Sequence, residues 1–146
     1  MRIDGIQHYL WRAVDQDGEV VDVFLQDQRD AVAARRFFKR LLAQAKPRKI
    51  VTDKLRSYSV ALRELIPETV HDTIQYANKR AELSHQPTRV RERGMRRFKS
   101  VRQAQCFLST HASVYNLFNL QRHLLSAKNY RVLRRDAFST WEEVVA

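Results

Sequence analysis

The sequence has a single cysteine and no long apolar run. Cys106 is the one cysteine among 146 residues, which excludes an internal disulfide, and no cysteine pair or Cys/His cluster has the spacing of a zinc site. No apolar stretch approaches the ~20 residues that a transmembrane helix needs, and the N-terminus lacks the apolar core of a signal peptide. We therefore expect a protein of the reducing cytoplasm.

Acidic residues are outnumbered by basic ones. The sequence has 27 Lys and Arg against 16 Asp and Glu, a net charge of +11, which is typical of nucleic-acid-binding proteins and also of ribosomal and membrane-surface proteins. With 44% hydrophobic residues, the chain is long enough for one domain with a core and too short for two ordinary ones. We predict that residues 1–146 form a single domain.

Turn sequences and β-forming residues predict hairpins at the start of the chain. The segments 9–14 and 19–25 are rich in β-formers and are separated by the turn sequence Asp15 to Gly18, which predicts two antiparallel strands. Asp4-Gly5 is a second hairpin signal, and only three residues precede it, fewer than the ~5 of an ordinary strand. We expect the chain to begin inside a strand.

A helix and a short buried strand are predicted next. Apolar residues recur at helical spacing from the N-cap Asp30 to Ala45, and Lys46-Pro47 ends the pattern. The strand over 49–52 follows, and the order strand, helix, strand predicts a right-handed crossover with parallel pairing. Asp53 would then lie at the carboxyl end of a strand, where ligands gather in open α/β sheets.

The second half of the chain is predicted to be mainly helical. A helix that starts near Asn78 should be kinked or interrupted at Pro87, and Ser100 should be the N-cap of a long helix. The other predicted elements are helices over 57–66 and 126–145 and a short strand over 70–74.

Two carboxylates are candidate metal ligands. Mg²⁺ prefers oxygen ligands such as Asp53 and Glu82, and two such ions can stabilise both the attacking and the leaving oxygen in a phosphoryl displacement. Each acid also has an ordinary interpretation. Asp53 could be a loop residue that forms an ion pair with Lys54 or Arg56, and Glu82 could simply interact with the dipole of its helix.

Basic residues dominate the segment from residue 79 to residue 99, where they outnumber acids by eight to two. Lys79 and Arg80 stand at the positive end of a predicted helix, where cations are unfavourable unless an anion is near. His85, one turn beyond Glu82, could contact a phosphate, although a helix-packing role is the more ordinary interpretation. The candidate phosphate-binding residues of this segment are Lys79, Arg80, His85, Arg89, Arg91, Arg93, Arg96, Arg97 and Lys99.

Several segments resemble one known family, the transposases of bacterial insertion sequences that have an integrase-like catalytic core and form cointegrates. The resemblance extends nearly end to end, as far as residues 141–143. The segments that carry it are YLWRAVD (9–15), VTDKLRSY (51–58), RAE and SHQPTR (80–89), RER (91–93) and MRRFKS (95–100).

The resemblance implies an α/β, ribonuclease-H-like mixed sheet flanked by helices, with the first strand largely missing and a helical C-terminal part. Such enzymes use three acids to hold two Mg²⁺ (or Mn²⁺) ions, and Asp53 and Glu82 correspond to the second and third. The implied partners are DNA of the element ends and of the target, with homo-oligomers in the intact family and a location at the bacterial nucleoid. Lys54, Arg56 and the basic residues from Lys79 to Lys99 would then contact DNA.

The first acid of the family belongs on a strand ahead of the Asp4-Gly5 turn. We therefore expect a transposase core that is cut at its front and has little or no activity alone, with Asp4 and Asp22 as poor substitutes for the missing ligand. Two alternatives stay open: a non-enzymatic DNA-binding remnant that regulates a full-length transposase, and a basic RNA-binding protein. Charge reversal of Arg96 and Arg97 should lower DNA affinity and flatten its salt dependence.

Overall fold

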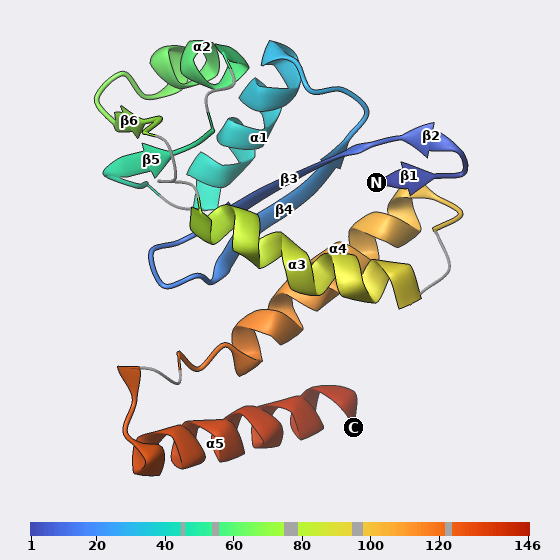
Figure 1. Cartoon of the computed structure of the whole chain (residues 1–146), viewed down its shortest axis with the longest axis vertical. Helices are drawn as coiled ribbons and strands as arrows, with labels where there is room; N and C mark the ends of the chain where they lie inside the picture. Colours follow the sequence, from blue (N-terminus) through green and yellow to red (C-terminus); the bar gives the residue numbers. More distant parts are fainter. Residues whose placement is uncertain (45, 54–55, 75–78, 95–97, 122–123) are drawn as a thin grey trace.

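The computed structural model describes residues 1–44, 46–53, 56–74, 79–94, 98–121 and 124–146, with the backbone alone for 56–57, 79–85 and 94. This part of the chain is a mixed α/β structure with five helices and three two-stranded sheets, so the predicted α/β class is confirmed. Figure 1 shows α1 and α2 on one side of the β3–β4 hairpin and α3 and α4 on the other. None of the described helices is long and apolar enough to cross a membrane.

A tight hairpin begins the chain, as the Asp4-Gly5 pair predicts. β1 (Arg2–Ile3) pairs antiparallel with β2 (Ile6–Gln7), and both turn residues have positive φ, 48° at Asp4 and 80° at Gly5. The mirror-image turns that suit hairpins require this conformation. The pairing continues one step further, because Met1 and His8 exchange hydrogen bonds through their N and O atoms at 3.0 and 2.8 Å.

The second hairpin is confirmed as well. β3 (Tyr9–Val14) pairs antiparallel with β4 (Val20–Gln26), with Trp11 opposite Phe24 and a bulge between Ala13 and Val14. Asp15 organises the turn because its Oδ1 accepts the backbone N–H groups of Asp17 and Glu19 at 2.8 and 2.9 Å. The turn residue Gly18 has a φ of 83°, which a residue without a Cβ adopts at no steric cost.

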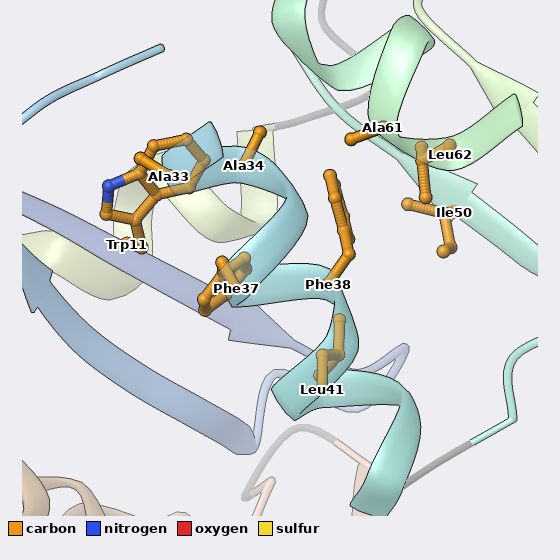
Figure 2. Close-up of a cluster of buried hydrophobic side chains, with 9 residues drawn as sticks. All are labelled: Trp11, Ala33, Ala34, Phe37, Phe38, Leu41, Ile50, Ala61 and Leu62. Carbon is orange, nitrogen blue, oxygen red and sulfur yellow. The ribbon is translucent and has the colours of Figure 1, made fainter. Parts of the chain in front are cut away.

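Apolar clusters cover both faces of the β3–β4 hairpin. α1 (Ala31–Gln44) packs its apolar stripe on one face, where Trp11 and Phe38 are 4% and 3% exposed, and Figure 2 shows the cluster continuing to α2 (Arg56–Leu65) and to β5 (Lys49–Val51). α4 (Val101–Phe118) packs on the opposite face. Its cluster contains Ile3, Val20, Val23, Leu25, Phe98, Ala104, Leu108 and Ala112.

Side-chain amides of α4 cover the outer edge of β4. Gln105 accepts the N–H of Leu25 and donates to the carbonyl of Val23, both at 2.9 Å. Asn116 makes the same pair of bonds with the N–H and carbonyl of Val20 at 2.8 and 2.9 Å. An unpaired strand edge is a template for pairing with another chain, so these amides protect this one.

Replacement of Gln105 by methionine should lower the free energy of unfolding by about 1–3 kcal/mol, because two partly buried backbone groups of β4 would lose their partners. Urea denaturation measures the change. Arg102→Met on the exposed side of the same helix is the control, with an expected change within about 0.5 kcal/mol. Equal stability of the Gln105 variant and the control would contradict the capping role.

The sheet around α1 differs from the prediction. β5 pairs in parallel with β6 (Val70–Asp72), and not with the strand that precedes α1, so the predicted parallel pairing across that helix was wrong for the residues that the structure describes. β5 cannot pair with β4 because α4 covers the outer edge of β4. A groove separates β5 from β3, the other strand of the hairpin. The predicted strand over 70–74 is confirmed in its first three residues.

The predicted helices are present, with one correction. α3 (Lys79–Gly94) runs through Pro87, so of the two expected outcomes the interruption was wrong, and the kink stays a prediction. Tertiary packing outweighs the lost backbone hydrogen bond, because the next residue, Thr88, is 1% exposed and accepts a hydrogen bond from Nη1 of Arg12 at 3.0 Å. The predicted N-cap Ser100 accepts the N–H of Gln103 at 3.2 Å.

The last helix, α5 (Ala127–Val145), begins after the N-cap Ser126, as predicted. It meets α4 through the rings of Phe118 and Phe138, whose centroids are 5.1 Å apart. Ala137 is 5% exposed, and much of the helix surface is open to solvent. The single-domain organisation stays a prediction.

Candidate functional site

Asp53 lies just beyond the carboxyl end of β5. The parallel pair extends to Thr52, whose N–H donates to the carbonyl of Asp72 at 3.1 Å. Oδ2 of Asp53 accepts a hydrogen bond from Nη2 of Arg29 at 2.8 Å, and 39% of the Asp53 side chain is exposed. The predicted location at a strand end is confirmed, and the ion pair includes Arg29, which was not among the predicted site residues.

Tyr58 joins this ion pair to the hydrophobic core. Burial, and then the negative charge of Asp53, raise the pKa of the Tyr58 hydroxyl, while its hydrogen bond with Arg29 acts in the opposite direction. The ring packs edge-on against Trp11 and Phe38, with centroid distances of 5.4 and 5.8 Å. Tyr58 therefore stays protonated at neutral pH and holds Arg29 in place beside Asp53.

Thr52 and His71 fix the backbone at Asp53. Thr52 is 8% exposed, and its hydroxyl donates to the carbonyl of Asp53 at 2.8 Å. Nε2 of His71 lies 2.7 Å from the same hydroxyl oxygen. Because that hydroxyl has a single proton, Nε2 of His71 is assigned as the donor in this contact.

Stability should decrease as the pH falls below about 6.5. Burial lowers the pKa of His71 below its ordinary value of 6.5, and this effect outweighs the opposing charge of Asp72. The unfolded chain then binds the proton more readily than the folded chain, so the stabilisation is present above 6.5 and is lost as the pH falls through the lowered pKa. Burial also lowers the pKa of His111, which adds to this slope.

Thermal unfolding measured from about pH 7.5 to about pH 5.5 tests this expectation. The His71→Gln variant should lose less of its melting temperature over this range than the native chain does, since glutamine cannot take up the proton. His111→Gln alone should also make the melting temperature less dependent on pH. Parallel pH profiles for the native chain and both variants would contradict the assignment.

A groove with a cavity volume of about 1070 Å³ lies between β3 and β5. Asp53 and Tyr58 line it on the β5 side, and Thr88, Arg89 and Glu92 of α3 line it as well. Glu82 lies on the same helix six residues before Thr88, a rise of about 9 Å along the axis. Asp53 therefore opens onto the same groove as the helix that carries Glu82.

The predicted site residues differ in how much of each the structure describes. The side chains of Glu82, Lys79, Arg80, His85 and Arg56 lie outside the description, although their backbones are helical. Lys54, Arg96 and Arg97 lie outside the described residues altogether. The convergence of Asp53 with Glu82 therefore stays a prediction. The other predicted DNA contacts are exposed: Arg89, Arg91, Arg93 and Lys99.

Sequence reasoning missed three neighbours of Asp53: Arg29, Tyr58 and His71. Arg29 had a detectable signal, because a cation directly before a helix N-terminus is unfavourable unless an anion lies near. Tyr58 stands in the VTDKLRSY segment that carries the family resemblance. His71 becomes a neighbour only through the pairing of β5 with β6, for which the sequence gives no local signal.

No group of three or more His, Cys, Asp or Glu side chains is placed to hold a metal ion within the part of the chain that the structure describes. Asp53 could contribute one carboxylate to a divalent cation, since its side chain is partly exposed and its oxygens are of the hard type that Mg²⁺ prefers. Such a cation would compete with Arg29 for the carboxylate.

Comparison with protein families matches residues 1–121 to a DDE domain. The chain is 33% identical over 150 residues to the transposase for insertion sequence-like element IS431mec of Staphylococcus aureus strain Mu50, covering 99% of this chain and 62% of that protein. The same values hold for the transposase of insertion sequence element IS257 in transposon Tn4003 of Staphylococcus aureus. Comparison with solved structures gave no significant match.

The family match covers most of the chain, and the chain spans 62% of the length of these relatives. The matched region contains the β3–β4 hairpin, Asp53 and all of α3. The chain therefore belongs to the DDE transposases of insertion sequences.

Proposed function

We propose that residues 1–146 are part of a transposase catalytic core that cleaves DNA strands and transfers them in a metal-dependent reaction. The observation that carries this proposal is the position of Asp53, just beyond a parallel strand and in the groove that α3 also lines. Ligands gather at this edge of α/β sheets because loops and helix ends converge there. Family membership supplies the reaction class.

A ribonuclease-H-like fold is the second part of the proposal. The antiparallel β3–β4 hairpin, the covering helix α1 and the parallel strand pair that begins with β5 are the kinds of element that a mixed sheet flanked by helices needs. In such a fold, β3 and β5 would belong to one mixed sheet. The groove between them separates the two strands here.

Asp53 and Glu82 are the proposed ligands for Mg²⁺ or Mn²⁺. Two divalent ions bound to such acids stabilise the attacking and leaving oxygens when a phosphodiester is displaced. In this chain, the hydrogen bonds from His71 to Thr52 and from Thr52 to the Asp53 carbonyl hold the backbone of the ligand in place. Arg29 neutralises the carboxylate in the absence of a cation.

DNA is the proposed partner, both at the element ends and at the target, with a homo-oligomer as the assembly. The net charge of +11 and the exposed arginines Arg89, Arg91 and Arg93 support DNA binding through phosphates. The proposed contacts also include Lys54, Arg56, Lys79, Arg80, His85, Arg96, Arg97 and Lys99.

Binding of Mn²⁺ tests the metal site directly. Asp53→Asn and Glu82→Gln should each weaken Mn²⁺ binding by at least about tenfold, measured by titration calorimetry or by the electron paramagnetic resonance signal of free Mn²⁺. Glu143→Gln, on the exposed surface of α5, is the matched control and should leave binding unchanged. Unchanged affinity in both site variants would overturn the proposed metal site.

A DNA-binding regulator without catalysis is the second candidate, favoured by the ion pair that Arg29 forms with Asp53. A nicking or strand-transfer assay with Mg²⁺ or Mn²⁺, on DNA that carries the element ends, separates the two candidates. Activity of residues 1–146 that is lost in Asp53→Asn would establish the enzyme. A core with little or no activity alone is also expected to bind DNA without cleaving it, so in that case Mn²⁺ binding that depends on Asp53 and Glu82 would favour the catalytic core, and DNA binding without Mn²⁺ binding would favour the regulator.

A further inference from the structure

The described side chains of α3 offer almost no apolar surface to fix the helix in place. They run from Gln86 to Arg93 and are mainly polar, and Val90, the one apolar side chain among them besides Pro87, is 66% exposed. Thr88 is the one fully buried side chain of this stretch. Helices of globular proteins are normally held by an apolar face, so the contact at Thr88 takes over that role here.

Arg12 of β3 makes this contact. Trp11 belongs to the cluster on the α1 face, so by the alternation of a strand Arg12 points to the opposite face, where α3 packs. Arg12 is 9% exposed, and its Nη1 donates to the hydroxyl of Thr88 at 3.0 Å. Its guanidinium carbon lies 6.0 Å from the ring centre of Tyr115 on α4. The described part of α3 packs more extensively on β3 than on any other element, so this hydrogen bond belongs to its main attachment.

The burial of Arg12 is costly for the fold. Nε and Nη2 are buried without a hydrogen-bond partner among the described residues, and the partner of Nη1 is a neutral hydroxyl rather than a carboxylate. Burial lowers the pKa of the guanidinium, as expected for a cation held away from water. Methionine at this position and valine in place of Thr88 would fill similar space without that cost, because replacing both partners of a buried hydrogen bond by apolar groups is nearly neutral. Stability therefore does not explain the arginine.

The attachment of α3 bears on the candidate site. Glu82 lies on the same helix six residues before Thr88, a rise of about 9 Å along the axis. Arg12, Thr88 and Asp53 line one groove. A helix that is fixed on β3 at Thr88 has a defined position relative to the β5 side of this groove, and its backbone carries Glu82 toward or away from Asp53.

We propose that Arg12 is a positioning residue whose hydrogen bond to Thr88 fixes α3 on β3 and thereby sets the position of Glu82 relative to Asp53. Arg12 acts through α3 and contacts neither metal nor DNA in this role. The importance of the distance between the two acids rests on the proposed function, whereas the attachment of α3 is independent of it.

Pulsed electron paramagnetic resonance between two spin labels measures the position of α3. The labels are placed at the exposed positions Arg36 of α1 and Gln86 of α3, each replaced by cysteine, in a chain with Cys106→Ser. Thr88→Val keeps the shape of the side chain and removes the acceptor, so the distance distribution should shift or broaden. Thr88→Ser keeps the hydroxyl and should leave the distribution unchanged.

A second pair of labels shows whether a change is confined to α3. It joins Arg36→Cys to the native Cys106 on α4, and its distance distribution should be the same in the native chain and in both Thr88 variants. Thr110→Val makes the same substitution at an exposed position of α4 and should change neither pair.

A combined variant, Arg12→Met with Thr88→Val, separates position from stability. Since it leaves no buried polar group of this contact unpaired, it should melt within about 4 °C of the native chain. It should nevertheless displace α3 as Thr88→Val alone does. A merely structural Arg12 predicts the reverse, a large loss of melting temperature and an unchanged distance in whatever folds.

Binding of Mn²⁺ tests the consequence for the site. Thr88→Val should weaken Mn²⁺ binding about tenfold, as the loss of a group that orients a metal ligand does. Thr88→Ser and Thr110→Val should bind Mn²⁺ as the native chain does. If neither Asp53→Asn nor Glu82→Gln changes Mn²⁺ binding, the proposed metal site fails, and the label distances still decide whether Arg12 positions α3.

Four results would overturn the proposal. An unchanged distance in Thr88→Val would mean that α3 is held without the hydrogen bond, and equal displacement by Thr88→Ser would mean that side-chain shape holds it. A combined variant that does not fold would make Arg12 a structural residue. Native Mn²⁺ affinity in Thr88→Val, together with weakened binding in the Asp53 and Glu82 variants, would separate the attachment of α3 from the metal site.

Discussion

Phe38→Ala is expected to lower the free energy of unfolding by about 3–5 kcal/mol, enough to unfold much of a marginally stable domain. Phe38 is 3% exposed on α1. Figure 2 shows its ring pointing from α1 toward Ala61 and Leu62 of α2, beside Ile50 of β5. Removing the ring would leave a cavity at the point where these three elements meet.

Equilibrium unfolding in urea measures this effect, and the same helix provides the control. Val32→Ala removes an apolar side chain that is 51% exposed, so its expected change is within about 0.5 kcal/mol. Phe38→Leu should fall between the two, because leucine fills part of the cavity. A loss in Phe38→Ala no larger than that in Val32→Ala would mean that α1 does not join β5 and α2 to the hairpin.

Local chemistry made much of the fold predictable. The Asp4-Gly5 and Asp15-to-Gly18 turns depend on residues that tolerate positive φ or accept nearby N–H groups, so neighbouring residues are sufficient to specify them. The N-caps Ser100 and Ser126 act within three residues of themselves. Periodic apolar residues likewise predicted the buried stripe of α1.

Contacts between distant residues were not predictable in the same way. Arg12 and Thr88 are separated by 76 positions, and this buried contact helps α3 to continue through Pro87 against its local preference. The partner of β5 depends on which strand edges other elements cover. In this chain the side chains of Gln105 and Asn116 cover the outer edge of β4, so β5 cannot pair there. No periodicity in the sequence predicts this cover.

In the candidate site, too, local patterns were predictable and contacts between distant residues were not. Asp53 was found from its place after a short apolar strand, a local pattern. Arg29 is 24 residues away, and its contact with Asp53 depends on how α1 packs over β5. A carboxylate can pair with cations that are distant in the sequence, and the ion pair of Asp53 with Arg29 depends on the tertiary structure.

Replacing Arg89, Arg91 and Arg93 together with glutamate is expected to reduce duplex DNA affinity strongly and to make it less dependent on salt. Each of these arginines is exposed on α3. If each contacts one phosphate, the slope of log K against log salt should decrease in magnitude by about 3, at roughly 0.9 per contact. Fluorescence anisotropy with labelled duplex DNA, over a series of salt concentrations, measures both quantities.

A second triple variant tests whether position or total charge matters. Arg131, Arg134 and Arg135 are exposed on α5, and their replacement by glutamate causes the same change in net charge, from +11 to +5, since each substitution removes two charges. A DNA surface on α3 predicts a much smaller loss of slope for the α5 variant. Equal losses would mean that affinity follows total charge. Since Arg91 and Arg93 also interact favourably with the C-terminal dipole of α3, thermal unfolding must show that the α3 variant is folded before the slopes are compared.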